Sequence, residues 1–277
     1  MVHEPFIKTE DDLLLIPKWE KKGHNLTAGF TTRLGGVSQS PYDSLNVGLH
    51  VSDNDSIVIK NRQIVSVKID FPIEQWVVGE QIHDSNIKKV TSSDCGKGAQ
   101  SLTSAVKDID GLYTKDKDIL LVSLYADCVP LYFFSPKHGM IGLAHAGWKG
   151  TVGKIGPKMI EIWKDEGIDP NDILVIIGPS IGQQQYEVDR NVIKAVDQVL
   201  PQTDTPPYIE SRPGHFFLDL KTLNKQLLIA AGIPSHCVKI SQYCTASRTD
   251  LFFSHRKEQG RTGRMMSFIG LKSNEDL

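Results

Sequence analysis

The sequence predicts an α+β protein in which mixed β-sheets are layered with flanking helices in a single compact domain, residues 1–277. Short apolar runs rich in β-branched and aromatic residues outnumber segments with helical periodicity, and the two kinds do not alternate as in a doubly wound parallel sheet. The chain has no internal repeat, and its most loop-like stretch, residues 201–213, is too short to separate two domains. With 40% hydrophobic and 23% charged residues, it can bury a core of ordinary size.

Four segments have the spacing of apolar residues that is typical of an amphipathic helix. The first spans residues 54–67. The second spans residues 151–166 and is followed by a glycine suited to a C-terminal cap. Asp219 is placed to cap a third helix, whose leucines form one stripe. Residues 188–200 are the fourth.

Apolar runs bounded by turn residues predict the strands. These runs are residues 26–32, 76–78, 119–124, 131–134, 140–144, 173–177 and 267–269. The most apolar stretch of the chain, residues 118–136, contains Asp127 and Pro130. Because a charge is costly in a membrane and proline breaks a helix, we expect buried strand there and no membrane span.

The charge balance excludes partners that are recruited by bulk charge. The chain has 31 basic and 33 acidic residues, so we expect neither nucleic acid nor an anionic membrane as a partner. The longest apolar run near the N-terminus, residues 13–17, is too short for a signal peptide. The four cysteines show no CxxC pairing, and we expect reduced thiols in a cytoplasmic protein. The sequence does not predict an oligomeric state.

Reactive side chains adjoin buried strands in three segments, namely residues 80–84, 126–130 and 144–150. Polar side chains at strand ends, beside small residues that permit close approach, are typical of active sites. The residues of interest are His83, Cys128 and His145, which are 45 and 17 residues apart along the chain. Because they form no local HxxxH or CxxC motif, only the fold could bring them together.

Two chemistries suit these three side chains. Two imidazoles and one thiolate form a sound ligand set for zinc, and three protein ligands leave a position for water, whose pKa zinc lowers. Alternatively, Cys128 is a nucleophile that attacks an acyl or amide carbon, with His145 or His83 as the base and Asp127 orienting it. Both chemistries need Cys128 deprotonated, so the sequence does not separate them. Neither a phosphate loop of the GxxxxGK[ST] type nor the deaminase signature HxE…PCxxC is present.

Seven motifs in this order resemble those of the laccase-domain family, also called multicopper polyphenol oxidases or the YfiH/YlmD-like family. They are TTRLGGVSQSPYDSLNVGLHV (31–51), EQIHDSNI (80–87), DGLYT (110–114), ADCVPLYF (126–133), HAGWKGTVGKI (145–155), GPSIG…YEV (178–188) and CTASRTDLFFSHRKEQGRTGRMMSFI (244–269). The resemblance implies mixed β-sheets layered with helices, and one zinc ion per chain bound by His83, Cys128 and His145.

The resemblance also implies an enzyme acting on purine nucleosides. The implied reactions are phosphorolysis of adenosine, inosine and 5'-methylthioadenosine, and deamination of adenosine to inosine, so the expected partners are purine nucleosides and phosphate. Many members have cysteines before YEV, where this chain has glutamines at 183–185, so no role is expected for thiols in that loop. Copper is not expected, because nine histidines without HxH pairs are too few for a multicopper oxidase.

Further site residues are predicted with a structural alternative for each. Asp127 either orients a ligand or substrate or satisfies buried backbone amides. Gln81 either contacts the substrate or caps neighbouring backbone. Arg33 and Asn46 are predicted to bind phosphate or ribose, against a surface salt bridge and a turn role respectively.

A C-terminal basic cluster, formed by His255, Arg256, Lys257, Arg261 and Arg264, adds two further predictions. Arg261 and Arg264 belong to the site or are solvent-exposed. Three classes of function follow for the chain as a whole: a zinc-dependent purine nucleoside enzyme, a Cys128-dependent hydrolase or amidase acting on a small amide or cell-wall precursor, and a non-catalytic binding domain.

Overall fold

The computed structural model describes residues 4–10, 12–20, 25–200 and 205–273. Within these ranges it contains three sheets and six α-helices, so the predicted α+β architecture with mixed sheets is confirmed. The helices are α1 (Pro17–Glu20), α2 (Asp55–Lys68), α3 (Trp148–Val152), α4 (Ile155–Asp165), α5 (Arg190–Asp197) and α6 (Leu220–Ala230). No helix in the described ranges is both long and apolar enough to cross a membrane.

Each of the two large sheets has six strands. In spatial order the first contains β1 (Ile7–Lys8), β2 (Leu13–Leu15), β3 (Leu26–Thr31), β15 (Met265–Leu271), β7 (Ile119–Tyr125) and β4 (Trp76–Val78). The second contains β14 (Val238–Ile240), β10 (Leu174–Ile177), β8 (Val129–Ser135), β9 (Met140–Ala146), β6 (Gly111–Thr114) and β5 (Ile87–Lys89). Both sheets are mixed, because β4–β7, β10–β14 and β5–β6 pair in parallel and the other pairs are antiparallel.

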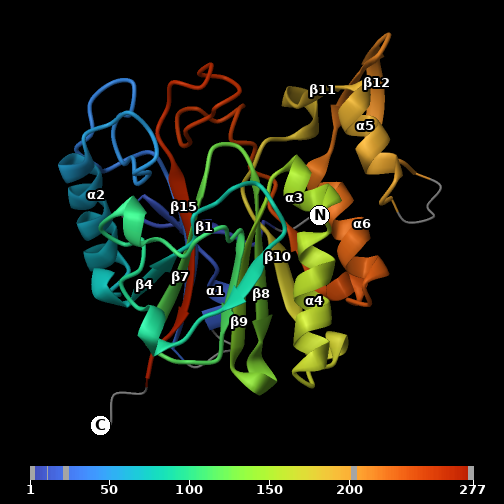
Figure 1. Ribbon diagram of the computed structural model, residues 1–277. Coiled ribbons are helices and arrows are strands. Elements are labelled where there is room, and N and C mark those ends of the chain that lie inside the picture. The colour runs from blue at the N-terminus through green and yellow to red at the C-terminus, as the bar shows by residue number, and fades with distance from the viewer. Residues whose placement is uncertain (1–3, 11, 21–24, 201–204, 274–277) are drawn as a thin grey trace.

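The two large sheets pack face to face, and helices cover their outer faces. Phe30, Leu121, Tyr132 and Leu143 belong to one buried cluster that joins the two sheets. In Figure 1, α2 lies beyond the first sheet and α4 and α6 lie beyond the second. Burying both faces of each sheet in this way removes a large apolar area from water and accounts for strands that are apolar throughout.

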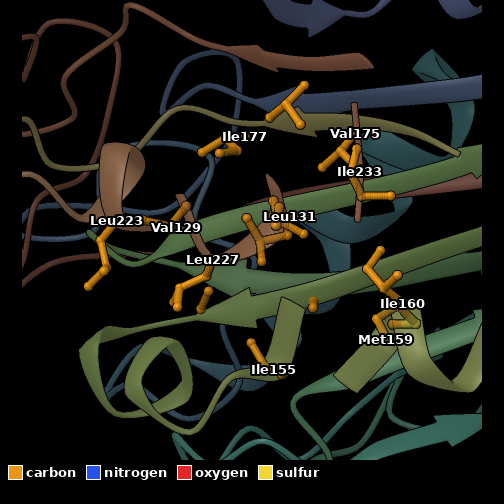
Figure 2. Packing of buried hydrophobic residues seen from close by; sticks show 14 of the residues in the cluster. Val129, Leu131, Ile155, Met159, Ile160, Val175, Ile177, Leu223, Leu227 and Ile233 are labelled. Carbon is orange, nitrogen blue, oxygen red and sulfur yellow. The ribbon is translucent and has the colours of Figure 1, made fainter. Parts of the chain in front are cut away.

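The helix-covered face of the second sheet contains the larger apolar cluster. Figure 2 shows Leu131 and Val175 of the sheet near Ile160 of α4 and Leu227 of α6. These side chains are almost completely buried, and Trp163 fills the space between α4 and β9. The core therefore holds α3 and α4 rigidly on the strand that precedes them.

Two predicted helices differ in extent from the observed ones. The segment predicted as one helix over residues 151–166 forms α3 and α4, because Lys154 adopts a left-handed conformation (φ 59°) that no α-helix accommodates. The predicted helix over residues 188–200 begins only at Arg190. The residues before it form β11 (Glu187–Asp189), and the Asp189 side chain accepts the amides of the first turn.

The remaining predicted elements are confirmed, with small changes in their ends. Asp219 caps α6 by accepting the Thr222 amide. A small third sheet, of β11, β13 (His215–Leu218) and β12 (Tyr208–Arg212), lies with α5 at one edge of the molecule (Figure 1). Residues 201–204 of the loop predicted over 201–213 lie outside the described residues, and the prediction is wrong for Tyr208–Arg212, which form β12 paired with β13.

Candidate metal centre

Strand register brings the three reactive segments to one end of the paired sheets. The chain leaves the first sheet at Tyr125 and enters the second at Val129, so Cys128 lies at the crossing between them. Val129 pairs with Ala146, which places His145 beside that crossing. On the other side, Gln81 pairs through its amide with the backbone of Leu124, at 2.9 and 2.7 Å, and fixes the segment that contains His83.

The ligand atoms of His83, Cys128 and His145 lie within 4.8 Å of one another. The two imidazole rings are 4.8 Å apart between centroids and nearly perpendicular, at 84°. His145 is buried, Cys128 is half-buried and His83 is exposed. One open face on a set of three convergent donors is the arrangement of a metal site that also admits a small molecule.

Asp110 orients both imidazoles. Its carboxylate accepts the backbone amides of Ile82, His83 and Asp84 at 2.9–3.2 Å, and it lies 2.8 Å from Nδ1 of His145. His83 itself has a positive φ of 62°, an unfavourable conformation for a non-glycine residue that three successive amides bound to one carboxylate stabilise. Since Nδ1 of His145 is bound to Asp110, its Nε2 is left to face Cys128 and His83.

Charge interactions favour the thiolate form of Cys128. Burial acts to raise the pKa of this thiol, but the adjacent His145 and His83 outweigh burial and the net pKa is lowered. Burial likewise acts to lower the pKa of His145, and Cys128 and Asp110 outweigh it in the opposite direction. A thiolate is the form of cysteine that binds metal and also the form that attacks as a nucleophile.

The donor set fits a metal ion. Two imidazoles and a thiol biased toward thiolate match the nitrogen and sulfur ligands that zinc prefers, at bond lengths of roughly 2.0–2.3 Å. The hydrogen bond from His145 to a buried carboxylate is the usual support of a metal-bound imidazole. The group formed by His83, Cys128 and His145 could therefore hold a metal ion.

Gly147, which follows His145 by two residues, lets the ligands approach closely. A Cβ at this position would lie 3.1 Å from Sγ of Cys128 and 3.3 Å from Cδ2 of His83. Its φ of −61° is one that alanine adopts without strain.

We expect Gly147→Ala to weaken metal binding while leaving the melting temperature almost unchanged. The added methyl group would displace the thiol and the imidazole by a few tenths of an ångström but would not strain the backbone. Competition with a chelator and a thermal melt of the same samples measure the two effects. A variant that melts several degrees lower and binds metal normally would contradict this role of Gly147.

His83, Cys128 and His145 lie in the wall of a cavity of about 630 Å³, within the range of small-molecule sites. Much of the wall is apolar and comes from both large sheets and the loops that follow them. Its apolar residues include Leu49, Val78, Leu124, Trp148, Ile181 and Tyr186. Such a cavity can enclose a planar heterocycle while the polar ligand cluster faces one part of it.

Besides His83, Cys128 and His145, three further residues predicted for the site line this cavity, namely Gln81, Asp127 and Arg264. The carboxylate of Asp127 accepts the Thr245 hydroxyl at 2.6 Å and the Arg256 amide at 2.9 Å, so it fastens the C-terminal loop beside Cys128. Gln81 forms both of its side-chain bonds with Leu124, as its structural alternative predicted.

Arg33, Asn46 and Arg261 are not among the cavity-lining residues. The guanidinium of Arg33 is 2.9 Å from Glu258, donates to two backbone carbonyls and stacks on Phe253. The buried Asn46 side chain accepts the amides of Gly48 and Arg264, and Arg261 is exposed. The contacts of Arg33 and Asn46 are those of structural residues, and a substrate role for either stays a prediction.

Several residues of the site were not predicted from the sequence. The sequence shows Asp110 only as part of the motif DGLYT and predicts no site role for His50. Arg62 and Arg256 also line the cavity. An aspartate directly before a short apolar strand, as in DGLYT, is the one local pattern that could have indicated Asp110. Arg256 belongs to the C-terminal basic cluster, whereas Arg62 and His50 have no local pattern that indicates a site.

The chain matches the family described as Multi-copper polyphenol oxidoreductase laccase over residues 27–272. It is similar to a protein named purine nucleoside phosphorylase YlmD from Bacillus subtilis (strain 168), with 44% identity over 274 residues and 98% of both chains covered. The protein of the same name from Geobacillus stearothermophilus is 48% identical over 244 residues, covering 88% of this chain and 89% of the relative.

Solved structures agree with this relationship. The crystal structure of YlmD from Geobacillus stearothermophilus superposes with a TM-score of 0.95 at 43% identity, covering 98% of this chain and 100% of the other. A Bacillus licheniformis hypothetical protein named YfiH superposes with a TM-score of 0.94 at the same identity and coverage. The chain therefore belongs to the laccase-like family, also called YfiH/YlmD-like, that its sequence motifs resemble.

Proposed function

We propose that this protein is a zinc-dependent purine nucleoside enzyme. The proposed reactions are phosphorolysis of adenosine, inosine and 5'-methylthioadenosine, and deamination of adenosine to inosine. The observation that carries the proposal is the convergence of His83, Cys128 and His145 in the wall of a largely apolar cavity. The relatives named purine nucleoside phosphorylase support the choice of substrate.

The cavity offers a nucleoside two kinds of surface. Apolar side chains such as Leu124 and Ile181 suit the faces of a purine ring, whose burial is favourable by roughly 25 cal/mol per Å² of apolar area. The charged and polar side chains of the cavity wall, such as Gln81 and Arg264, suit the ribose and phosphate. The same cavity therefore provides for both halves of the proposed substrate pair.

Zinc bound by these ligands would supply Lewis acidity next to the substrate. The protein's own residues prepare the site for it. Asp110 holds the His145 ring in one orientation and the His83 backbone in its left-handed conformation, and the two imidazoles favour the thiolate of Cys128. Asp127 fastens the segment that contains Thr245 and Arg256 beside Cys128.

A cytoplasmic location is part of the proposal. All four cysteines are free in the structure, including Cys128, as expected for a reducing compartment.

We expect about one zinc ion per chain in the purified protein, because three N and S donors with an open position suit zinc. Elemental analysis of protein prepared under metal-replete conditions measures the content. Copper at one equivalent in the absence of zinc would contradict the metal assignment.

The experiment that tests the function is an assay of adenosine with and without inorganic phosphate. Phosphorolysis would yield adenine and ribose 1-phosphate only when phosphate is present, whereas deamination would yield inosine in both conditions. If adenosine is unchanged in both conditions, and inosine and 5'-methylthioadenosine are not cleaved in the presence of phosphate, the proposal is wrong.

A second candidate function rests on the chain of contacts from Cys128 to His145 to Asp110. That order of thiol, imidazole and carboxylate is also the order of a cysteine nucleophile with its base and orienting group. The orienting carboxylate is that of Asp110 and not, as predicted, that of Asp127, whose oxygens accept hydrogen bonds from Thr245 and Arg256. It would suit a hydrolase or amidase acting on a small amide or cell-wall precursor. The position of His83 favours the metal, because a nucleophile with one base has no need of a second convergent imidazole.

A further inference from the structure

Three guanidinium groups in the cavity wall, those of Arg62, Arg256 and Arg264, have no carboxylate partner in the part of the chain that the structure describes. Arg256 is exposed, donates to the Glu187 carbonyl and lies over the Tyr186 ring, whereas Arg62 is buried and Arg264 is half-buried. The two carboxylates that line the cavity are engaged elsewhere, since Glu80 pairs with Lys107 at 3.3 Å and both oxygens of Asp127 accept hydrogen bonds. By contrast, Arg33 and three exposed arginines form ion pairs with acidic residues.

Arg62 is 2% exposed, the most completely buried arginine of the described residues. Its Nε donates to the Val47 carbonyl at 2.8 Å, and its Nη1 donates to the carbonyls of Gly98 and Ala99 at 2.6 and 2.8 Å. Within the described ranges Nη2 has no hydrogen-bond partner. Burial lowers the pKa of this guanidinium to about 10, and a buried charge without a counter-ion is costly.

Arg264 is held next to the loop of residues 46–48, whose Val47 carbonyl also binds Arg62. Its backbone amide and that of Gly48 share the side-chain oxygen of Asn46, at 2.9 and 3.0 Å, so Asn46 fastens the loop before His50 to the strand end that carries Arg264. Nη1 of Arg264 donates to the carbonyls of Thr262 and Gly263, and Nη2 and Nε have no partner among the described residues. One edge of the guanidinium is therefore free.

His50 completes this part of the wall. It lines the cavity and forms no hydrogen bond to any residue in the described ranges. Burial and the nearby Arg264 and Arg62 lower its pKa to about 4, so it is a neutral imidazole at pH 7 and can donate one N–H without adding charge.

We propose that Arg62, Arg264 and His50 form the phosphate subsite of the cavity and bind inorganic phosphate as a dianion. The assignment rests on the proposed function, in which phosphate is a co-substrate, and names the residues that receive it. Two guanidiniums with free Nη groups supply charge and several N–H donors, which suit the oxygens of a phosphate. The dianion would supply the missing counter-charge of the buried Arg62.

The test is calorimetric titration of the purified, metal-containing protein with inorganic phosphate in the absence of nucleoside. We expect Arg264→Gln to weaken phosphate binding roughly 10- to 100-fold, the loss for a hydrogen bond to a charged group. His50→Ala removes a neutral donor, and we expect it to weaken phosphate binding less, by a few-fold. Arg62 stays unchanged in both variants because its three carbonyl contacts support the fold.

Two matched variants sharpen the comparison. Arg248→Gln removes an exposed arginine that is paired with Asp250 outside the cavity, and should bind phosphate normally. Arg33→Gln tests the alternative phosphate ligand predicted from the sequence. Folded Arg264→Gln with unchanged phosphate affinity, or a loss confined to Arg33→Gln, would overturn the subsite.

A parallel titration with adenosine 5'-monophosphate separates free phosphate from the phosphate of a nucleotide. Nucleotide binding that depends on Arg264, with no binding of inorganic phosphate, would also overturn the assignment. Phosphate binding that depends on Arg264 in a protein forming no ribose 1-phosphate would support the subsite and contradict only the phosphorolysis.

Discussion

His145→Ala and His83→Ala should each lose the metal and convert adenosine to inosine at least roughly 10³-fold more slowly than the unmodified protein. Each change leaves two of the three convergent donors, and two protein ligands hold zinc much more weakly than three. Of the two, His145→Ala should have the stronger effect on the site, because it also removes the hydrogen-bond partner of Asp110.

The fold should survive both changes. The apolar clusters of the two large sheets do not include either histidine, and a chain of this length buries enough surface without a metal. The measurements are zinc content, thermal melting and inosine formation on the same preparations.

His138→Ala is the matched control. His138 lies in the turn between β8 and β9, at the end of these strands opposite to Val129 and Ala146, and it contacts Ser135 outside the cavity. It should keep both metal and activity. Near-normal deamination by a zinc-free His83→Ala or His145→Ala would instead favour the Cys128 nucleophile.

Local patterns were enough to predict the fold class and about half of the strands. Asp219 was predicted to cap a helix and does so, and seven of the fifteen strands in the described residues, namely β3, β4, β7, β8, β9, β10 and β15, were recognised by their β-branched and aromatic content. The break between α3 and α4 was not predicted, because the apolar stripe continues across Lys154 and only its backbone conformation divides the two helices. The other eight strands were not predicted. Seven of them, β1, β2, β5, β6, β11, β13 and β14, have only two to four residues, and β12 lies in the segment predicted as a loop.

For the candidate site, the sequence indicated the residue types but not their supporting contacts. His83, Cys128 and His145 lie together because β7 leads into β8 across the two sheets and β9 returns beside it, a register that their spacing of 45 and 17 residues does not show. The sequence also does not show which arginines have an acidic partner in the fold. Nothing local distinguishes Arg33, which is bound to Glu258, from Arg62, which is buried without an acidic partner.

Asp110→Asn is expected to weaken metal binding roughly 10- to 100-fold, the usual effect of removing the carboxylate behind a metal-bound imidazole. The amide that replaces the carboxylate has one accepting oxygen, whereas the present side chain accepts three backbone amides and lies 2.8 Å from His145 Nδ1. The left-handed His83 backbone would lose part of its support, and the His145 ring would lose its fixed orientation.

Stability should fall as well. Leaving one or two of these partly buried amides without their acceptor costs roughly 0.5–1.5 kcal/mol each, which lowers the melting temperature by a few degrees in a protein of this size. The metal affinity of Asp110→Asn therefore has to be compared with that of a control variant, one that loses a similar amount of stability at a residue that does not contact His83, Cys128 or His145.

Asp94→Asn provides that comparison. Asp94 is also a buried aspartate, it accepts the Thr91 amide and the ammonium groups of Lys88 and Lys97, and it does not line the cavity. We expect Asp94→Asn to melt at a lower temperature but to hold its metal normally in competition with a chelator. If the two variants lose metal equally, Asp110 acts only through general stability. If only Asp110→Asn loses metal, the carboxylate acts by positioning the two imidazoles. Asp110 is not among the residues that line the cavity, so it has no direct contact with a substrate bound there.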